Sequence, residues 1–219
     1  MDFDLISYNM GLAAGGGGET VDRSLQNSWL AGMRMNAGFI GGFTSSSAKW
    51  QPYNAANTGR LSVDWSKPWT MHLRFKFTEL ETDRRECLYG TDTTGVYFQG
   101  TLTTEVLKED NWWFGFSTNG TSWDIQDVIS TSEVPYVAGT VYTLHIIYDG
   151  STITISVSDG EHTASRTLTS ANPLYYNSSY KLAFGNIAES GALYARYTYF
   201  DPYDCYIESQ GAMVWGAKR

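Results

Sequence analysis

The sequence has little positive charge and no long apolar run. Its 15 Lys and Arg against 23 Asp and Glu give a net charge of −8, and no basic cluster occurs, so nucleic acid is a poor partner. No run of about 18 apolar residues is present, so no membrane insertion is expected. The N-terminus, MDFDLISYNMGLAAGGGG, has no basic n-region and no apolar h-region, so we expect no secretory signal peptide and synthesis in a cytoplasm.

Cysteine is also scarce. Cys87 and Cys205 lie far apart, and neither a C-x-x-C motif nor a Cys/His ligand spacing exists. A zinc site is therefore not expected. The two cysteines are interpreted as free, half-buried thiols, with a disulfide as the alternative.

Acidic residues could in principle bind calcium, which takes oxygen ligands from loops. They are spread over different turns without EF-hand spacing, so we interpret them as solvated turn residues and expect no metal and no cofactor. The candidates are Asp92, Asp124, Asp127, Asp149 and Asp159.

The abundant residues favour β-structure. The 219 residues are 42% hydrophobic and 15% aromatic but only 17% charged. From about residue 59 the hydrophobic period is two: in WTMHLRFKF, residues 69–77, apolar side chains alternate with Thr, His, Arg and Lys. VYTLHIIYDGSTITISVSDG indicates a hairpin in which Asp149-Gly150 supplies the positive φ angles of a two-residue turn.

Many short strands at near-regular spacing predict an all-β fold, an antiparallel β-sandwich of the jelly-roll type over residues 59–219. Further strands are predicted at 86–90, 95–99, 112–117, 163–169, 180–185, 192–199, 203–208 and 212–215.

Residues 1–58 differ in composition. They hold nine glycines, four of them consecutive at 15–18, which disfavours regular structure because ordered glycine loses much backbone entropy. A short amphipathic helix over 21–34 is predicted from Val21, Leu25, Trp29 and Met33. We interpret residues 1–58 as an extended anchoring arm in which Leu25, Trp29 and Met33 make the attachment; a flexible leader is the alternative.

The stretch FGFSTNGTSWDI contains a glycosylation sequon at Asn119 and a turn signal. Asn119-Gly120 predicts a type I′ turn between two strands. The sequon, like that at Asn177, would matter only on a secretory route, so both are interpreted as turn composition.

Aromatic residues next to polar ones form the most promising binding set. Sugars bind through C–H faces laid on aromatic rings, supplemented by hydrogen bonds to amides, hydroxyls and carboxylates. The alternative for each aromatic is a role in the core or in a subunit interface. The candidate carbohydrate-binding residues are Asn119, Trp123, Asp124, Tyr175 and Tyr176.

Five segments, WTMHLRFKF, WFGFSTNGTSWDI, YTLHIIYDGSTITISVSDG, YKLAFGN and DPYDCYIESQGAMVWGA, together resemble a LamG-like, concanavalin-type lectin/glucanase domain of bacteriophage virion proteins. The resemblance covers about residues 60–219 and implies a displayed, trimeric particle component. One departure is Pro202, where a proline places that part of the strand at an edge or a bulge.

The glucanases that share this fold carry an E-x-D-x-x-E strand, whose letters recur here at Glu81, Asp83 and Glu86. The residues between them include Arg84 and Arg85, which cannot face a sandwich core unpaired. The stretch is therefore interpreted as a charged hairpin. The three histidines lack a nucleophile context and are interpreted as surface or sheet-face residues.

These observations predict a non-enzymatic virion protein on the particle surface, as a head decoration, head fibre or tail-associated domain. Its partners would be capsid or tail proteins through the arm, with glycans as further ligands. A stand-alone lectin module is the alternative, and a glucanase is the third hypothesis.

Overall fold

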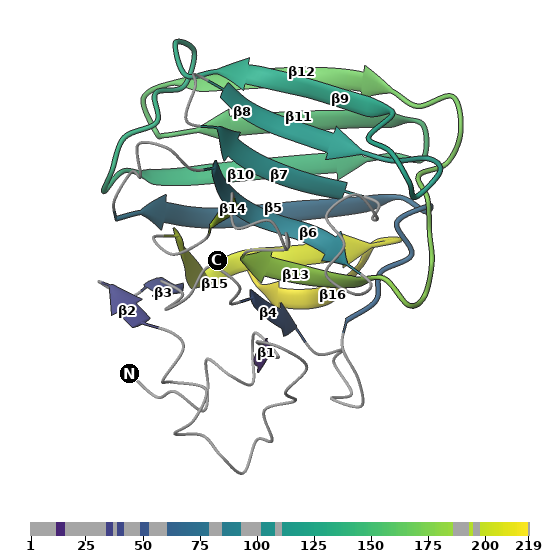
Figure 1. The fold of residues 1–219 in the computed structure, drawn as a ribbon, viewed down its shortest axis with the longest axis horizontal. Helices are drawn as coiled ribbons and strands as arrows, with labels where there is room; N and C mark the ends of the chain where they lie inside the picture. The colour runs from purple at the N-terminus through teal and green to yellow at the C-terminus, as the bar shows by residue number, and fades with distance from the viewer. Residues whose placement is uncertain are drawn as a thin grey trace.

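The computed structural model describes residues 61–78, 85–92, 102–107, 111–185, 193–194 and 198–218, together with four short strands between residues 12 and 52. They form two eight-stranded sheets that pack face to face (Figure 1). All pairings are antiparallel except that of β14 with β6. The predicted all-β, antiparallel sandwich is therefore confirmed.

We name the two sheets A and B. Sheet A runs in the order β1 (Leu12–Gly15), β4 (Lys49–Pro52), β13 (Lys181–Gly185), β6 (Arg85–Asp92), β7 (Leu102–Leu107), β8 (Asn111–Phe116) and β9 (Ile125–Ser130), with β14 (Leu193–Tyr194) beside β6. Sheet B runs in the order β12 (Thr163–Thr169), β11 (Thr152–Ser158), β10 (Val141–Tyr148), β5 (Trp69–Phe77), β15 (Thr198–Ser209), β3 (Phe39–Gly41) and β2 (Arg34–Asn36), with β16 (Ala212–Ala217) beside β15.

The core lies between the sheets and is built by alternation. On β5 every apolar residue of the predicted face is at most 2% exposed. β8 of the other sheet contributes Trp112, Phe114 and Phe116, all fully buried. Each large apolar side chain transferred from water contributes about 1.5–3 kcal/mol. The period-two pattern is therefore also the main source of stability.

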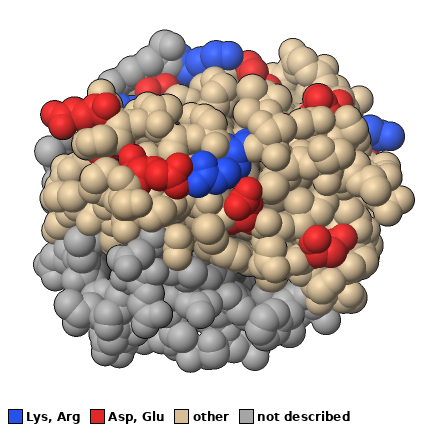
Figure 2. Space-filling model, turned by 90° about the horizontal axis from the view of Figure 1, so that it is seen from above, with Lys and Arg blue, Asp and Glu red and all other residues tan. Residues whose placement is uncertain are grey.

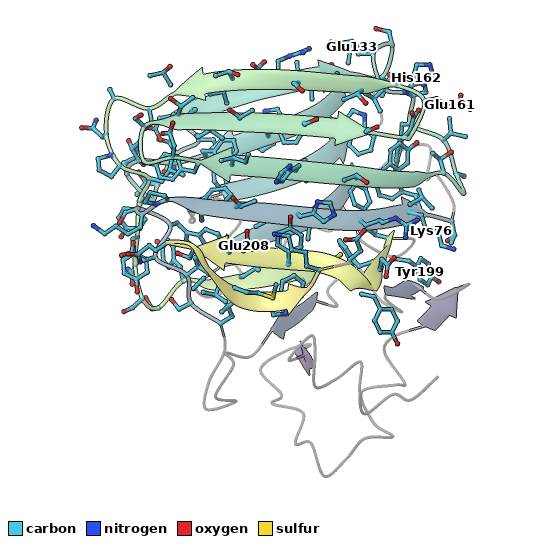
Figure 3. The ribbon with its side chains drawn as sticks, turned by 180° about the vertical axis from the view of Figure 1, so that it is seen from behind. Lys76, Glu133, Glu161, His162, Tyr199 and Glu208 are labelled. Carbon is cyan, nitrogen blue, oxygen red and sulfur yellow. The ribbon has the colours of Figure 1, made fainter. Side chains whose placement is uncertain are left out.

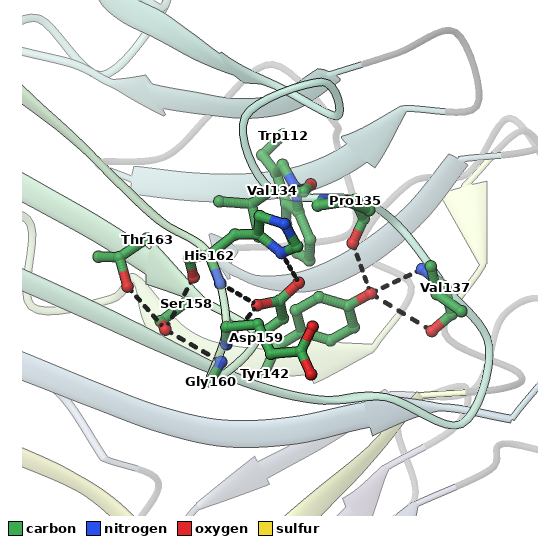
Figure 4. Close-up of polar contacts among 11 residues, drawn as sticks. Trp112, Val134, Pro135, Val137, Tyr142, Ser158, Asp159, Gly160, His162 and Thr163 are labelled. Atoms are coloured by element: carbon green, nitrogen blue, oxygen red, sulfur yellow. Dashed lines mark hydrogen bonds and ion pairs between the residues drawn. The ribbon is translucent and has the colours of Figure 1, made fainter.

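Two buried aromatic residues attach the 131–140 connection to the core (Figure 4). The hydroxyl of Tyr142 donates to Pro135 O at 2.7 Å and accepts the Val137 N–H at 2.6 Å. The indole N–H of Trp112 donates to Val134 O at 3.0 Å. Both rings thus bury their apolar bodies and still satisfy their polar atoms.

Strand β15 corrects the predicted pair of strands at 192–199 and 203–208. It is a single strand of 12 residues, and its pairing with β5 shifts register between Phe200 and Cys205. Pro202 lies inside this irregularity, as the sequence predicts for a residue that has no N–H to donate. Cys205 has a free thiol that is fully rather than half buried, and burial raises its pKa. Nothing is described of the Cys87 side chain.

The N-terminal strands enter both sheets. β4 pairs with β13 in sheet A, and β3 pairs with β15 in sheet B. The predicted helix over 21–34 lies outside the described residues except at Arg34, which belongs to β2. The division into an arm of residues 1–58 and a domain of residues 59–219 stays a prediction. Among the described residues, no helix has the length and apolarity needed to cross a membrane.

Candidate functional site

The connection between β8 and β9 is an eight-residue loop, residues 117–124, closed by its own side chains. Asn119 Oδ1 accepts the backbone N–H groups of Thr121 at 2.8 Å and Ser122 at 3.0 Å. Gly120 has a φ of 76°, but Asn119 is not among the residues with positive φ. The predicted type I′ turn is therefore wrong, because such a turn needs positive φ at both positions.

Asp124 closes the other end of the loop. Its two carboxylate oxygens accept the backbone N–H of Thr118 at 2.9 Å and the Thr118 hydroxyl at 2.5 Å. Partial burial pulls the pKa of Asp124 up, but the hydrogen bonds from Thr118 outweigh it and leave that pKa below its ordinary value. The carboxylate is therefore ionised at neutral pH and fixed in place.

Two tryptophans lie side by side next to this loop. Trp113 is on β8, on the side of sheet A that faces away from the core, and its six-membered ring covers Gly115. A Cβ at Gly115 would lie only 2.4 Å from Trp113 Cη2, so only glycine lets the indole lie against the strand here. Trp123 meets Trp113 edge to face, with ring centroids 6.2 Å apart and an interplanar angle of 81°. Both side chains are half-buried.

Polar groups border this aromatic pair. The Trp113 indole N–H donates to Gln126 Oε1 at 3.3 Å, and the Gln126 side chain is exposed. The indole N–H of Trp123 is buried and finds no hydrogen-bond partner among the described residues. An orphaned donor of this kind costs about 1–3 kcal/mol. The site therefore combines a stacking surface, an exposed amide and one unsatisfied donor.

The structure brings four of the five predicted carbohydrate-binding residues together. Asn119, Trp123 and Asp124 belong to the loop. The Tyr175 ring packs under it, since a Cβ on Gly120 would lie 2.5 Å from that ring. Tyr176 follows in the chain and is 40% exposed.

Their roles differ, however. Asn119 Oδ1 and the Asp124 carboxylate already accept hydrogen bonds within the loop. The Tyr175 ring packs against the backbone at Gly120. Trp123 alone joins the aromatic pair. The candidate set from the sequence left out Trp113, and Gln126 was not considered. The available signal was Gly115, two residues after Trp113 and therefore on the same face of the strand.

The outer face of sheet B, the sheet nearer the viewer in Figure 3, carries a second polar cluster. His145, His72 and Tyr206 are in register across β10, β5 and β15. His72 stacks on Tyr206 with ring centroids 4.9 Å apart, and Lys218 Nζ lies 4.7 Å from the centroid of the Tyr206 ring. The histidines are thus sheet-face residues, as the sequence indicates.

Burial lowers the pKa of both His72 and His145, and the positive charge of Lys218 lowers both further. His72 Nε2 lies 3.4 Å from Asp204 Oδ1, which raises its pKa in part. The Nε2 atoms of both histidines are buried, as is the Trp123 indole nitrogen, but the Gln126 side chain beside the tryptophan pair is exposed.

Of the acids considered as calcium ligands, Asp124, Asp149 and Asp159 lie in loops or turns, as expected, whereas Asp127 lies in β9 and Asp92 ends β6. Asp149 Oδ1 accepts the N–H groups of Ser151 and Thr152. Asp159 Oδ1 accepts those of Glu161 and His162, and Figure 4 shows the Asp159–His162 contact. Among the described part of the chain, no group of three or more His, Cys, Asp or Glu is arranged to hold a metal ion. Glu81 and Asp83 lie outside the described residues.

No protein-family profile matches the chain, and no curated protein matches its sequence. The fold, in contrast, matches solved structures. A family 7 alginate lyase, A1-II′ Y284F in complex with product GGG, aligns with a TM-score of 0.57 at 12% identity over 93% of this chain and 96% of that one. Truncated AlyQ, with CBM32 and alginate lyase domains, gives 0.58 at 10% identity over 94% and 62%.

The enzymatically active domain of bacteriophage CBA120 tailspike protein 2 aligns with a TM-score of 0.50 at 11% identity, covering 75% of this chain and 24% of that one. At these identities the likeness defines the fold, a concanavalin-like jelly-roll sandwich that carbohydrate-active proteins use. Neither the LamG-like family nor a phage origin follows from it.

These neighbours correct one prediction. The sequence predicts a protein that is not an enzyme, but the similar structures are alginate lyases and the enzymatically active domain of a tailspike. The interpretation of residues 81–86 as a charged hairpin concerns only the glucanase reaction, and one fold can support many reactions.

Proposed function

We propose that this protein binds a polysaccharide on the outer face of sheet A, with Trp113, Trp123 and Gln126 as the contact residues. The observation that carries the proposal is the indole of Trp113 lying on the strand over Gly115, beside Trp123. A rigid, half-exposed ring on a sheet is a good platform for the apolar face of a sugar, because little conformational entropy is lost on contact.

The polar groups would set the orientation of the sugar. Gln126 accepts from Trp113 through Oε1, which leaves its amide N–H groups for sugar hydroxyls. The Trp123 N–H is unsatisfied but buried, so it would gain a sugar hydroxyl as a partner only if the ring or the loop moved on binding. Jelly-roll neighbours that act on polysaccharides support the proposal at the level of the fold.

The direct test replaces Trp113 with alanine and measures retention of the protein in gels that contain soluble polysaccharides. We expect at least about a tenfold loss of affinity, equivalent to about 1.4 kcal/mol. Ile147→Ala is the matched control, because Ile147 is an exposed apolar residue on sheet B. Gln126→Ala is a second variant that leaves the packing intact. Unchanged affinity in both site variants would refute the proposal.

The same incubations should be examined for shortened polysaccharide chains, since the fold is shared with lyases. Cleavage would add catalysis to binding. A residue whose replacement abolishes cleavage without changing retention would then identify the catalytic group.

We further propose that the protein is a component of a bacteriophage particle, attached through residues 1–58 to capsid or tail proteins. The resemblance of residues 60–219 to domains of virion proteins supports this, as does the fold shared with a tailspike domain. Mass spectrometry of purified particles is the test. Absence of the chain from particles, with abundant protein in the lysate, would favour a free lectin.

A further inference from the structure

We infer that the ligand of this surface is an uncharged polysaccharide rather than a polyuronate such as alginate. This inference rests on the proposed function and adds the chemical class of the ligand. It separates the protein from the alginate lyases whose fold it shares.

The chain that builds the site is almost free of cations. Between Lys108 and Arg166 there is no Lys or Arg, while the same stretch holds eight acids. It contains β8, β9 and the loop between them, and therefore Trp113, Trp123 and Gln126. The acids are Glu109, Asp110, Asp124, Asp127, Glu133, Asp149, Asp159 and Glu161.

The acid nearest to the tryptophans is held in its charged form. Asp124 follows Trp123 directly, and the hydrogen bonds from Thr118 keep its pKa below the ordinary value. On the neighbouring strand β7, the residue in register with Trp113 is another acid, Glu105. An ionised carboxylate therefore follows Trp123 in the chain, and the backbone register places a second acid opposite Trp113.

The first cation after this stretch, Arg166, is already engaged. Its guanidinium pairs with Glu133 Oε2, and its Nε–H donates to Val128 O at 2.9 Å. Figure 2, which looks down on the β9 and β12 edge, shows basic side chains lying next to acidic ones on a largely uncharged surface. Arg166 consequently offers little to a carboxylate ligand.

Recognition of a polyuronate needs the opposite arrangement. Each sugar of such a polymer carries a carboxylate, which proteins bind best with free Arg forks or Lys. Against a protein of net charge −8, the polymer would instead meet like-charge repulsion. An uncharged hexose polymer loses nothing in this field and gains the stacking and amide contacts.

The experiment measures retention of the full-length protein in gels containing sodium alginate, polygalacturonate, or neutral glucans, galactans and mannans, at low and high salt. We expect wild-type protein to be retained by a neutral polymer at least about tenfold more strongly than by either polyuronate. Salt should barely alter the neutral interaction, because screening acts on charges.

A charge variant tests the cause. Val128 is 36% exposed and in register with Trp113, so Val128→Lys places a cation beside the platform. It should gain alginate retention that salt abolishes. Ile147→Lys makes the same charge change on sheet B, at a residue that is 41% exposed, and should not gain it.

The outcomes separate the two proposals. Preferential retention of wild-type protein by alginate or polygalacturonate would overturn this inference and leave the proposed function standing. An equal gain in the two lysine variants would show that overall charge, and not this surface, controls binding, and would also overturn it. Retention by none of the polymers would defeat the proposed function itself.

Discussion

Gly120 shows how one residue supports the candidate site. Its φ of 76° is a conformation that side-chain-bearing residues rarely adopt, and the Tyr175 ring occupies the space of a Cβ. We expect Gly120→Ala to destabilise the protein by about 1–3 kcal/mol through strain alone, and the collision with Tyr175 adds to that. Urea unfolding measures the change.

Gly160 provides the control for Gly120. It has a φ of 94°, but a Cβ there would meet nothing within 4 Å. Gly160→Ala should therefore lower the stability less than Gly120→Ala does, because it adds backbone strain but no collision with a neighbouring side chain. Equal losses would show that Tyr175 does not support the loop.

The histidine row predicts a dependence of stability on pH. His72 and His145 are packed with Asp204, Tyr206, Lys218, Arg74 and Glu208 around them, and their pKa values are lowered, chiefly by burial, from an ordinary 6.5. A base whose pKa is lower in the folded state binds fewer protons there than when unfolded. Its contribution is thus fully present above the unfolded pKa of 6.5 and is lost as pH falls from there through the lower folded pKa.

The test compares urea midpoints at about pH 7.5 and about pH 5.5, a window that spans the ordinary histidine pKa. The wild-type protein should lose more stability than the double variant His72→Gln/His145→Gln, which retains all the carboxylates. His162→Gln is the control, because His162 is exposed and lies on a turn. If the double variant and the wild type lose the same stability, the row does not titrate as described.

At the scale of elements, the sequence predicts those strands whose burial alternates. β5, β11 and β12 match WTMHLRFKF, TITISVS and residues 163–169, because one buried face forces a period of two. β7 was missed, since LTTEVL mixes its apolar and polar positions. The 117–124 loop was mistaken for a tight turn because the partner of Asn119 Oδ1 is the backbone beyond Gly120, which a dipeptide signal does not reveal.

The candidate site was only partly predictable for a similar reason. Trp123 and Asp124 adjoin a turn signal and attract attention, whereas Gln126 has no sequence mark of its own. Its relation to Trp113 depends on the register of β8 with β9, in which Gln126 faces Gly115. Register is a property of the sheet and not of either strand.

Arg166 gives a prediction about the sheet edges. β9 and β12 end their sheets, and the Arg166 guanidinium satisfies Val128 O on β9 from a position on β12. Unguarded edges promote pairing with other chains. We expect Arg166→Gln to raise association on warming, measured by light scattering, while Lys67→Gln, with the same charge change on an exposed turn, does not. Identical scattering of the two variants would show that Arg166 does not protect the sheet edges from association.

At the scale of the whole molecule, the arm of residues 1–58 is open to a deletion test. Chain 59–219 should remain a folded, soluble β protein that no longer joins particles, because the large buried core starts at Leu61. Circular dichroism and particle incorporation are the measurements. The deletion also removes β4, which pairs with β13, and β3, which pairs with β15. If the shortened chain fails to fold without these strands, the division into arm and domain is wrong.

The assembly expected from the resemblance is a homotrimer. Sedimentation of the full-length protein should then give three times the 24.4 kDa of one chain. If the protein sediments as a monomer even at high concentration, the trimer prediction is wrong. The proposed glycan-binding surface does not depend on it.

The measurement closest to the central claim is an NMR titration of the tryptophan side chains with a neutral oligosaccharide. The chain has eight tryptophans, and the indole N–H of each gives one signal, assigned by Trp→Phe variants. Binding on sheet A should shift the signals of Trp113 and Trp123 and leave those of the core residues Trp65, Trp112 and Trp215 unchanged. Saturable binding that moves none of the Trp113 and Trp123 signals, or that instead moves the imidazole signals of His72 and His145, would contradict it.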